Sequence, residues 1–271
     1  TSIDTNVGMF RRALRNREAG LVVDEMEYDF KLFPNLQEIM IETDTFTASP
    51  RHTEEVCEEV LRRNLKISWC CNARVDIRPD LLRLMRRAGC RWICVGFEFG
   101  TQEALDAVEK GTTIEQGREF TIAADREGIA VHGCFMIGAP GETRQSALAT
   151  IEYAKSLPLD TIQLTGLTPY PGTKLYDWAK ENGYLVPQNW KNWVNDDYEQ
   201  ATLLDYPQLR KDEIDELINI GLCSFYLRPR HMLRQLKMLR SMSDVKRKLY
   251  GLSSFFDSVI RKDREKTNVQ S

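Results

Sequence analysis

The sequence predicts an α/β fold, in which a partial TIM-like (β/α) barrel is followed by a helical C-terminal region. Two observations lead to this prediction. Short apolar segments rich in β-branched and aromatic residues recur about every 25 to 40 residues, and a helix-period pattern separates each segment from the next. This alternation is typical of βαβ units, whose right-handed crossovers build a parallel sheet. The 271 residues have room for one such domain with an appendage.

Five segments have the composition of strands, and helical patterns lie between them. The predicted strands are Glu38–Glu42, Lys66–Asn72, Arg91–Phe97, Ile129–Ile137 and Thr161–Leu167. The predicted helices are Val22–Leu32, Thr53–Asn64, Pro79–Ala88, Gln102–Val108 with Ile114–Glu127, and Thr143–Leu157. The alternation then gives way to a loop over 184–205 and to helical sequence from Pro207 onward. We therefore divide the chain into an N-terminal remnant (1–21), a partial barrel (22–205) and basic amphipathic helices (206–271).

A motif containing polar residues or glycine follows each predicted strand. The motifs read ETDTFT from Glu42, NARVD from Asn72, GFEFGT from Gly96, GAPGET from Gly138 and TPYPGT from Thr168. In parallel barrels the chemistry lies at these C-terminal strand ends. Glycines at 138 and 141 suit close approach to a ligand, although helix capping by Glu142 or Thr143 explains them as well. Glu98 and Asp44 end buried-looking strands, so a ligand or an arginine such as Arg74 would have to pair with them.

In order and content, these five motifs resemble the radical S-adenosylmethionine (radical SAM) family, and most of all its cobalamin-dependent branch. The resemblance runs from about Val22 to Leu185 and continues more weakly over 223–230. It implies a barrel of the radical SAM type that binds S-adenosylmethionine (SAM). The resemblance implies that Glu42 and Asp44 contact the methionine end of SAM, and that Arg74 and Glu98 contact its carboxylate and ribose. It implies that the adenine of SAM contacts Met136, Ile137 and Gly138, with Pro140 and Gly141 in the same turn. Beside the adenine or the substrate it places Thr168, Pro169 and Tyr170. The chain departs from the residues that the family often has at Phe99, Cys134 and Met136.

The resemblance also implies a 4Fe–4S cluster, which the family holds with three cysteines spaced Cys-x-x-x-Cys-x-x-Cys. The chain has seven cysteines but no such triplet. Cys90 and Cys94 have the first spacing, but in a strand four residues span about 13 Å, which is too far for one cluster. Some of Cys71, Cys94 and Cys134 could share a face of neighbouring strands, but the favoured interpretation is inert core thiols, and no metal ligand is predicted. We interpret the chain as a fragment, or a diverged member, without the cluster loop and without the cobalamin domain that usually comes earlier in this branch.

The resemblance implies that the full-length enzyme cleaves SAM to a 5′-deoxyadenosyl radical, with cobalamin serving methyl transfer or ring formation. No catalytic residue is assigned. Two alternatives stay open at this point. One is an unrelated barrel enzyme that uses Asp44 and Glu98 as an acid/base pair. The other is a cluster-less barrel that serves as a binding or scaffold module.

The charge of the chain is concentrated near its C-terminus. The net charge is −3, yet the segment 228–266 contains twelve Lys or Arg against four Asp or Glu. Leucines and other apolar residues recur there at steps of three or four, which predicts basic amphipathic helices. Such helices either pack onto protein or bind anionic membrane surfaces. The expected partner is a small-molecule or lipid-like substrate, and a lipid-like substrate would give membrane binding a purpose. No nucleic-acid motif accompanies the charge. We expect a cytoplasmic protein with reduced thiols, possible membrane association and no nucleic-acid partner.

Overall fold

The computed structural model describes residues 14–186, 189–194 and 200–237. The sheet and its helices, in chain order, are α2 (Ala19–Leu32), β1 (Ile39–Ile41), the 3-10 helix η1 (Phe46–Ala48), α3 (Pro50–Arg62), β2 (Trp69–Ala73), α4 (Pro79–Arg87), β3 (Cys90–Glu98), α5 (Gln102–Ala107), α6 (Ile114–Glu127), β4 (Ala130–Ile137), α7 (Arg144–Ser156) and β5 (Thr161–Gly166). After the sheet come α8 (Lys174–Glu181), the 3-10 helix η2 (Trp190–Trp193), α9 (Lys211–Tyr226) and α10 (Pro229–Lys237).

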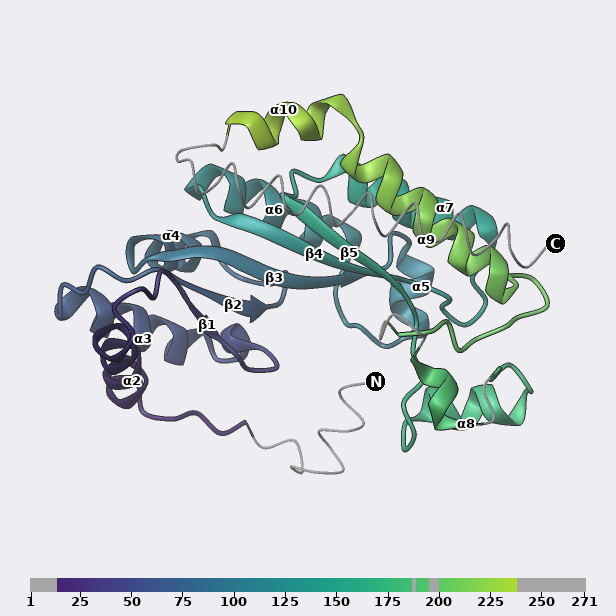
Figure 1. Ribbon diagram of the computed structural model, residues 1–271, viewed down its shortest axis with the longest axis horizontal. Coiled ribbons are helices and arrows are strands. Elements are labelled where there is room, and N and C mark those ends of the chain that lie inside the picture. Colours follow the sequence, from purple (N-terminus) through teal and green to yellow (C-terminus); the bar gives the residue numbers. More distant parts are fainter. Residues whose placement is uncertain (1–13, 187–188, 195–199, 238–271) are drawn as a thin grey trace. The chain divides into compact units, whose positions relative to one another are not determined.

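The five strands form one parallel sheet in the order β1-β2-β3-β4-β5, and they lie side by side in Figure 1. A parallel sheet whose spatial order follows the chain order is the arrangement that successive right-handed crossovers produce, and it places the connecting helices on one face. This confirms the predicted α/β fold of the partial-barrel type. Within the part of the chain that the structure describes, the sheet is open, with β1 and β5 at its edges.

Burial alternates along the central strands and separates the two faces of the sheet. On β3 and β4, residues such as Ile93, Val95, Val131 and Phe135 are buried against the helices. The opposite side chains are only half-buried. We call this second side the inner face; its residues, which the strand register aligns, are Met40, Cys70, Asn72, Trp92, Cys94, Gly96, His132, Cys134, Met136, Thr161, Gln163 and Thr165.

Aromatic rings fill the layer between the central strands and α7. Phe97 and Phe135 stack with their ring centroids 5.2 Å apart, and Tyr153 packs edge-on against both. The Tyr153 hydroxyl donates a hydrogen bond to the Ile114 carbonyl at 2.9 Å, so burial leaves its polar end satisfied. Such ring pairs contribute about 0.5–1.5 kcal/mol each beyond the area that they bury. They fix β3, β4 and α7 as a rigid support for the strand ends.

Among the differences from the predicted elements, the starts of one strand and one helix and the presence of a further helix have local reasons. β2 begins at Trp69 rather than Lys66, because its neighbour β1 offers partners only from Ile39, which is aligned with Trp69. α3 begins at Pro50 rather than Thr53, because Ser49 accepts a hydrogen bond from the His52 amide at 3.3 Å and caps the helix. α8 was not predicted as a separate helix, although Thr173 caps it in the same way.

The chain divides into two compact units, Thr1–Leu222 and Cys223–Ser271. In the second unit the structure describes the end of α9 and helix α10. There Phe225 packs against Tyr226 and His231, and the Arg228 guanidinium lies 4.0 Å from the Phe225 ring centroid. Most of the predicted basic helices, 238–271, lie outside the described residues.

None of the described helices is both long enough and apolar enough to cross a lipid bilayer.

Candidate functional site

The predicted site residues lie along the side of the sheet where the five parallel strands end, which we call the C-terminal edge. Glu42 and Asp44 follow β1, Arg74 follows β2, and Glu98 ends β3. The remaining predicted residues occupy the ends of β4 and β5 and the turns after them: Met136, Ile137, Gly138, Pro140, Gly141, Pro169 and Tyr170. The shared edge follows from the parallel topology. Which of these residues contact a cofactor stays a prediction.

Glu98 is the residue with the most unusual conformation at this edge. Its φ is 65°, in the left-handed region that residues with a side chain rarely adopt, and it sits at an irregularity in the pairing of β3 with β4. The carboxylate folds back over Gly96, where an added Cβ would overlap it. Lys110 Nζ donates to Glu98 Oε1 at 2.5 Å, and both side chains are about four-fifths buried. Strained residues of this kind concentrate at functional sites.

Of the two kinds of partner expected for the strand-end carboxylates, a ligand or an arginine such as Arg74, the structure contradicts Arg74. Arg74 pairs with its neighbour Asp76, with Nε 3.1 Å from Oδ2, whereas Glu98 pairs with Lys110. Asp44 and Glu42 are exposed, so they do not end a buried strand. The reason is that β1 is a three-residue edge strand and ends at Ile41, before either carboxylate. The acid/base pair of Asp44 and Glu98 therefore gains no support from the geometry.

The turn after β4 satisfies its own backbone. Gly138 has a φ of 107°, and the amides of Gly138 and Ala139 donate to Glu142 Oε2 at 2.5 and 3.0 Å. The Tyr206 hydroxyl donates to the Gly138 carbonyl at 2.9 Å. Thr143 caps α7 in a capping box with Ser146. Helix capping, one of the two interpretations of this motif, therefore accounts for the turn. The Gly138 and Ala139 amides already donate hydrogen bonds within the chain.

Glu142 is itself a buried carboxyl group. It is 4% exposed, and burial raises its pKa to about 7, although the Gly138 and Ala139 amides act in the opposite direction. Its Oε1 has no hydrogen-bond partner among the described residues. Neither Glu142's burial nor the Tyr206 contact has a sequence signal, because Tyr206 lies 68 residues after Gly138.

The other predicted residues around the turn do not share one environment. Ile137 is fully buried on the helix-covered face, so it cannot face the same ligand as Met136 on the inner face. This follows from the two-residue period of a strand. Pro169 is buried, whereas Tyr170 is 58% exposed and lies near Trp193. Pro140 lines a shallow pocket with Lys174, Leu175 and Trp178 of α8, and Gly141 is exposed.

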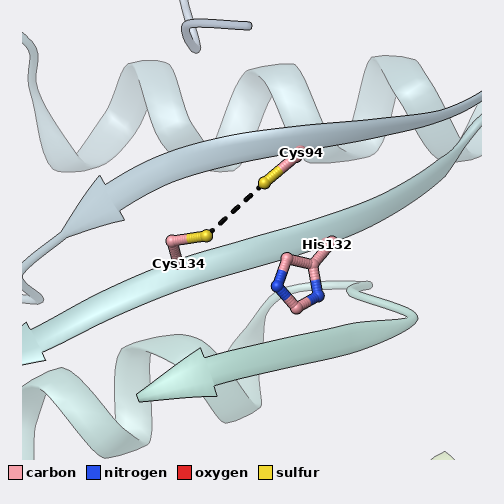
Figure 2. Close-up of side chains that lie close together, drawn as sticks. All are labelled: Cys94, His132 and Cys134. Atoms are coloured by element: carbon pink, nitrogen blue, oxygen red, sulfur yellow. Dashed lines mark hydrogen bonds between the residues drawn. The ribbon is translucent and has the colours of Figure 1, made fainter. Parts of the chain in front are cut away.

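Two cysteines and a histidine converge on the inner face, as Figure 2 shows. Cys94 Sγ and Cys134 Sγ are 3.5 Å apart, and one nitrogen of His132 completes a set of ligand atoms that all lie within 4.8 Å of one another. The hydrogen bond between the two thiols lowers the pKa of Cys94 and raises that of Cys134. Burial lowers the pKa of His132. Sequence analysis missed His132, and its candidate Cys71 is on the opposite face.

The other thiols of the sheet region are buried. Cys70 lies on the inner face of β2, but it is 6% exposed, and burial raises its pKa to about 11. Cys57, Cys71 and Cys90 are fully buried between the sheet and its helices. Burial raises the pKa of Cys57 to about 12 and that of Cys90 well above its usual value. Thiols that are fully enclosed in apolar surroundings are inert as nucleophiles and as metal ligands. The prediction of inert core thiols describes this group and does not extend to Cys94 and Cys134.

Comparison with known proteins identifies relatives of this chain. Residues 5–154 match the family model described as the radical SAM superfamily. An uncharacterized methyltransferase of Pyrococcus horikoshii is 29% identical over 231 residues, which cover 84% of this chain and 49% of the relative. An anaerobic magnesium-protoporphyrin IX monomethyl ester cyclase of Rubrivivax gelatinosus is 32% identical over 170 residues, covering 62% of this chain and 30% of the relative.

Among solved structures, the fold is similar to that of TsrM from Kitasatospora setae, a radical S-adenosylmethionine methyltransferase. Its structure with cobalamin and a [4Fe–4S] cluster bound gives a TM-score of 0.57 at 21% identity, over 74% of this chain and 41% of that one. This likeness concerns the fold alone. The chain spans about half, or less, of the length of the curated relatives named above.

Proposed function

The chain belongs to the radical SAM superfamily, and we propose that it supplies the SAM-binding part of a radical SAM enzyme. The observation that carries the proposal is Glu98, held in a strained conformation by Lys110 at the C-terminal edge of the sheet and turned onto the inner face. A carboxylate in that place would accept hydrogen bonds from hydroxyl or ammonium groups of a ligand lying across the strand ends. Lys110 engages Oε1, which leaves Oε2 as the acceptor.

The cysteines present do not fit the 4Fe–4S cluster that the family implies. All seven cysteines lie among the described residues. Cys57, Cys71 and Cys90 are enclosed in the core, Cys70 is buried on β2, and Cys223 belongs to the second unit. On the inner face only the Cys94 and Cys134 sulfurs lie within hydrogen-bond distance of each other. A cluster of this kind needs three thiolates around one open space. We therefore derive no step of the reaction through a cluster held by this chain.

The chemistry of the whole protein is proposed from its relatives. Two of them are named as a methyltransferase and a cyclase, and the TsrM structure contains cobalamin. We propose that the complete enzyme carries out methyl transfer or ring formation on a small-molecule or lipid-like substrate, with cobalamin as a further cofactor. In this scheme the role of the present chain is to bind and orient SAM. The cofactors would supply the reactive species.

Equilibrium dialysis with radiolabelled SAM tests the proposal. Replacing Glu98 by Gln removes the charge from the acceptor and the ion pair, and we expect SAM to bind about 10- to 100-fold more weakly. Glu103→Gln is the matched control, because Glu103 is an exposed carboxylate in the first turn of α5. Equal SAM affinity in the Glu98 variant and the unmodified chain would remove Glu98 from the site. A folded chain without any SAM affinity would favour the scaffold alternative.

A further inference from the structure

Three metal-binding side chains converge on the inner face because of the strand register. Cys94 of β3 is aligned with His132 of β4, and Cys134 lies two residues further along β4. Aligned residues of neighbouring parallel strands point to the same face, and so do residues two apart on one strand. The three groups therefore share a face by virtue of the backbone. Figure 2 shows the Cys94 thiol reaching from β3 toward Cys134, with the imidazole on the same strand as Cys134.

We propose that Cys94, His132 and Cys134 form a binding site for a single soft divalent cation of the Zn²⁺ type. This inference does not rest on the proposed SAM-binding function.

The separations of the donor atoms suit one tetrahedral ion. Zinc–sulfur bonds of about 2.3 Å and zinc–nitrogen bonds of about 2.0–2.1 Å place two sulfur ligands about 3.8 Å apart and a sulfur and a nitrogen about 3.6 Å apart. The two sulfurs are 3.5 Å apart, and no pair among the three donor atoms exceeds 4.8 Å. Side-chain movements of about an ångström would complete the geometry. Two thiolates and one imidazole form a soft donor set that favours Zn²⁺ over Mg²⁺ or Ca²⁺.

Thr161 orients the imidazole in the way that metal sites require. His132 Nδ1 lies 2.7 Å from the Thr161 hydroxyl oxygen, and Thr161 is the residue of β5 aligned with His132. A histidine that donates Nδ1–H to an oxygen keeps Nε2 unprotonated for a metal, and such supporting contacts tune affinity. The hydroxyl thereby fixes the ring orientation, and in the tautomer in which Nδ1–H donates to it, Nε2 is available for a metal.

The fourth coordination position would face the inner side of the sheet. Gln163 is exposed on β5, and its amide oxygen lies 3.9 Å from the Cys134 sulfur. All three ligand residues are themselves only half-buried. With three protein ligands, the ion would keep one position for water or a small molecule, as open zinc sites do.

Metal titration of the reduced, metal-free chain tests the site. We expect one Zn²⁺ per chain by calorimetry. Co²⁺ as the probe should give thiolate-to-metal charge-transfer absorption of an intensity that corresponds to two thiolates. Cys94→Ser and Cys134→Ser should each weaken Zn²⁺ binding by at least about 100-fold, and Thr161→Val should weaken it by about 10-fold with unchanged stoichiometry.

Cys223→Ser is the matched control, because it removes a half-buried thiol from the second unit of the chain. It should leave Zn²⁺ affinity unchanged. The proposal is overturned if the Cys94→Ser, Cys134→Ser double variant binds Zn²⁺ as tightly as the unmodified chain. Should the variants fail to fold, the Co²⁺ spectrum of the unmodified chain still decides, because the absence of thiolate charge transfer also overturns the site.

Discussion

At the scale of single residues, Glu142 couples the turn after β4 to pH. Burial raises its pKa to about 7 from an ordinary value of 4.5, so the folded chain holds this proton more tightly than the unfolded chain does. Its contribution to stability is therefore complete below about pH 4.5 and is lost as the pH rises through about 7. Above that range the folded state contains a buried carboxylate with two amide donors on one oxygen.

We expect this group to lower the free energy of unfolding by about 2–3 kcal/mol between pH 4.5 and 8. Glu142→Gln keeps a carbonyl acceptor for the Gly138 and Ala139 amides but cannot ionise. The variant should lose this part of the pH dependence, which urea unfolding at several pH values measures. Glu103→Gln, at an exposed position, should keep the slope of the unmodified chain. Identical slopes in the Glu142 variant and the unmodified chain would contradict the assignment.

Individual contacts were the part of the site that sequence could least predict. Glu98 was recognised from its motif, but its partner Lys110 lies twelve residues later and is placed by the loop between α5 and α6. Arg74 was the more obvious candidate, yet Asp76 is within its reach two residues away. His132 has no motif of its own, and only the register of β4 against β3 brings it to Cys94. Such pairings depend on tertiary placement, which local patterns do not encode.

At the scale of elements, helix α7 anchors the turn that closes the candidate site. Thr143 accepts a hydrogen bond from the Ser146 amide at 3.3 Å, and the Thr143 amide donates to the Ser146 hydroxyl at 2.9 Å. Two of the unpaired amides at the start of the helix are thereby satisfied. The cap follows directly after Glu142, so loosening it also loosens the turn.

Thr143→Ala should reduce the free energy of unfolding by about 1 kcal/mol, because it removes the acceptor for the Ser146 amide. Chemical denaturation monitored by circular dichroism measures the loss. Thr143→Ser keeps the hydroxyl and should stay within about 0.5 kcal/mol of the unmodified chain. Equal losses in both variants would show that the cap hydroxyl does not stabilise α7.

Elements were predicted well where the hydrophobic period was strong. The strands over 91–97 and 129–137 match β3 and β4 within a residue at each end, because their buried residues alternate regularly. The predicted strand Lys66–Asn72 begins three residues before β2. The pairing with the edge strand β1, and not the composition, determines where β2 begins. α8, an eight-residue helix that follows the Thr173 cap, was not predicted as a separate helix.

At the scale of the whole molecule, the open sheet leaves the inner face with side chains that are only half-buried. The described part of the chain provides five parallel strands, and their polar ends line one edge. Family membership explains the order of the motifs, whereas the arrangement of the cysteines differs from what the family implies. SAM binding by Glu98 and the absence of a cluster held by the cysteines can be tested separately, because they concern different side chains.

We expect that the chain does not hold a 4Fe–4S cluster. Its cysteines offer no three thiolates around one space, since Cys57, Cys70, Cys71 and Cys90 are buried and only the Cys94 and Cys134 sulfurs lie within hydrogen-bond distance of each other on the inner face. Anaerobic reconstitution with iron and sulfide, followed by analysis of both elements, measures this. Iron bound without sulfide at one ion per chain would agree with the single-ion site at Cys94, whereas about four irons and four sulfides per chain would refute the expectation.

The last prediction concerns the basic C-terminal segment, most of which lies outside the described residues. Helix α10 begins this segment, and it exposes Met232 and Leu233 beside a sequence in which Lys and Arg outnumber Asp and Glu by eight. Each basic residue near an anionic bilayer contributes about 1 kcal/mol, and salt screens this attraction. We propose that the segment binds anionic membrane surfaces, which would bring the protein to a lipid-like substrate.

Liposome co-sedimentation measures this binding. We expect pelleting with vesicles that contain phosphatidylserine, little pelleting with neutral phosphatidylcholine vesicles, and a loss of binding as salt rises. Replacing Lys246, Arg247 and Lys248 by Glu should abolish it, because the change reverses the charge of the densest basic cluster. Changing Lys31, Arg51 and Arg126 to Glu alters the net charge equally, at positions outside the segment, and should preserve binding. Pelleting that does not depend on lipid charge would mean that the basic residues serve contacts within a larger protein instead.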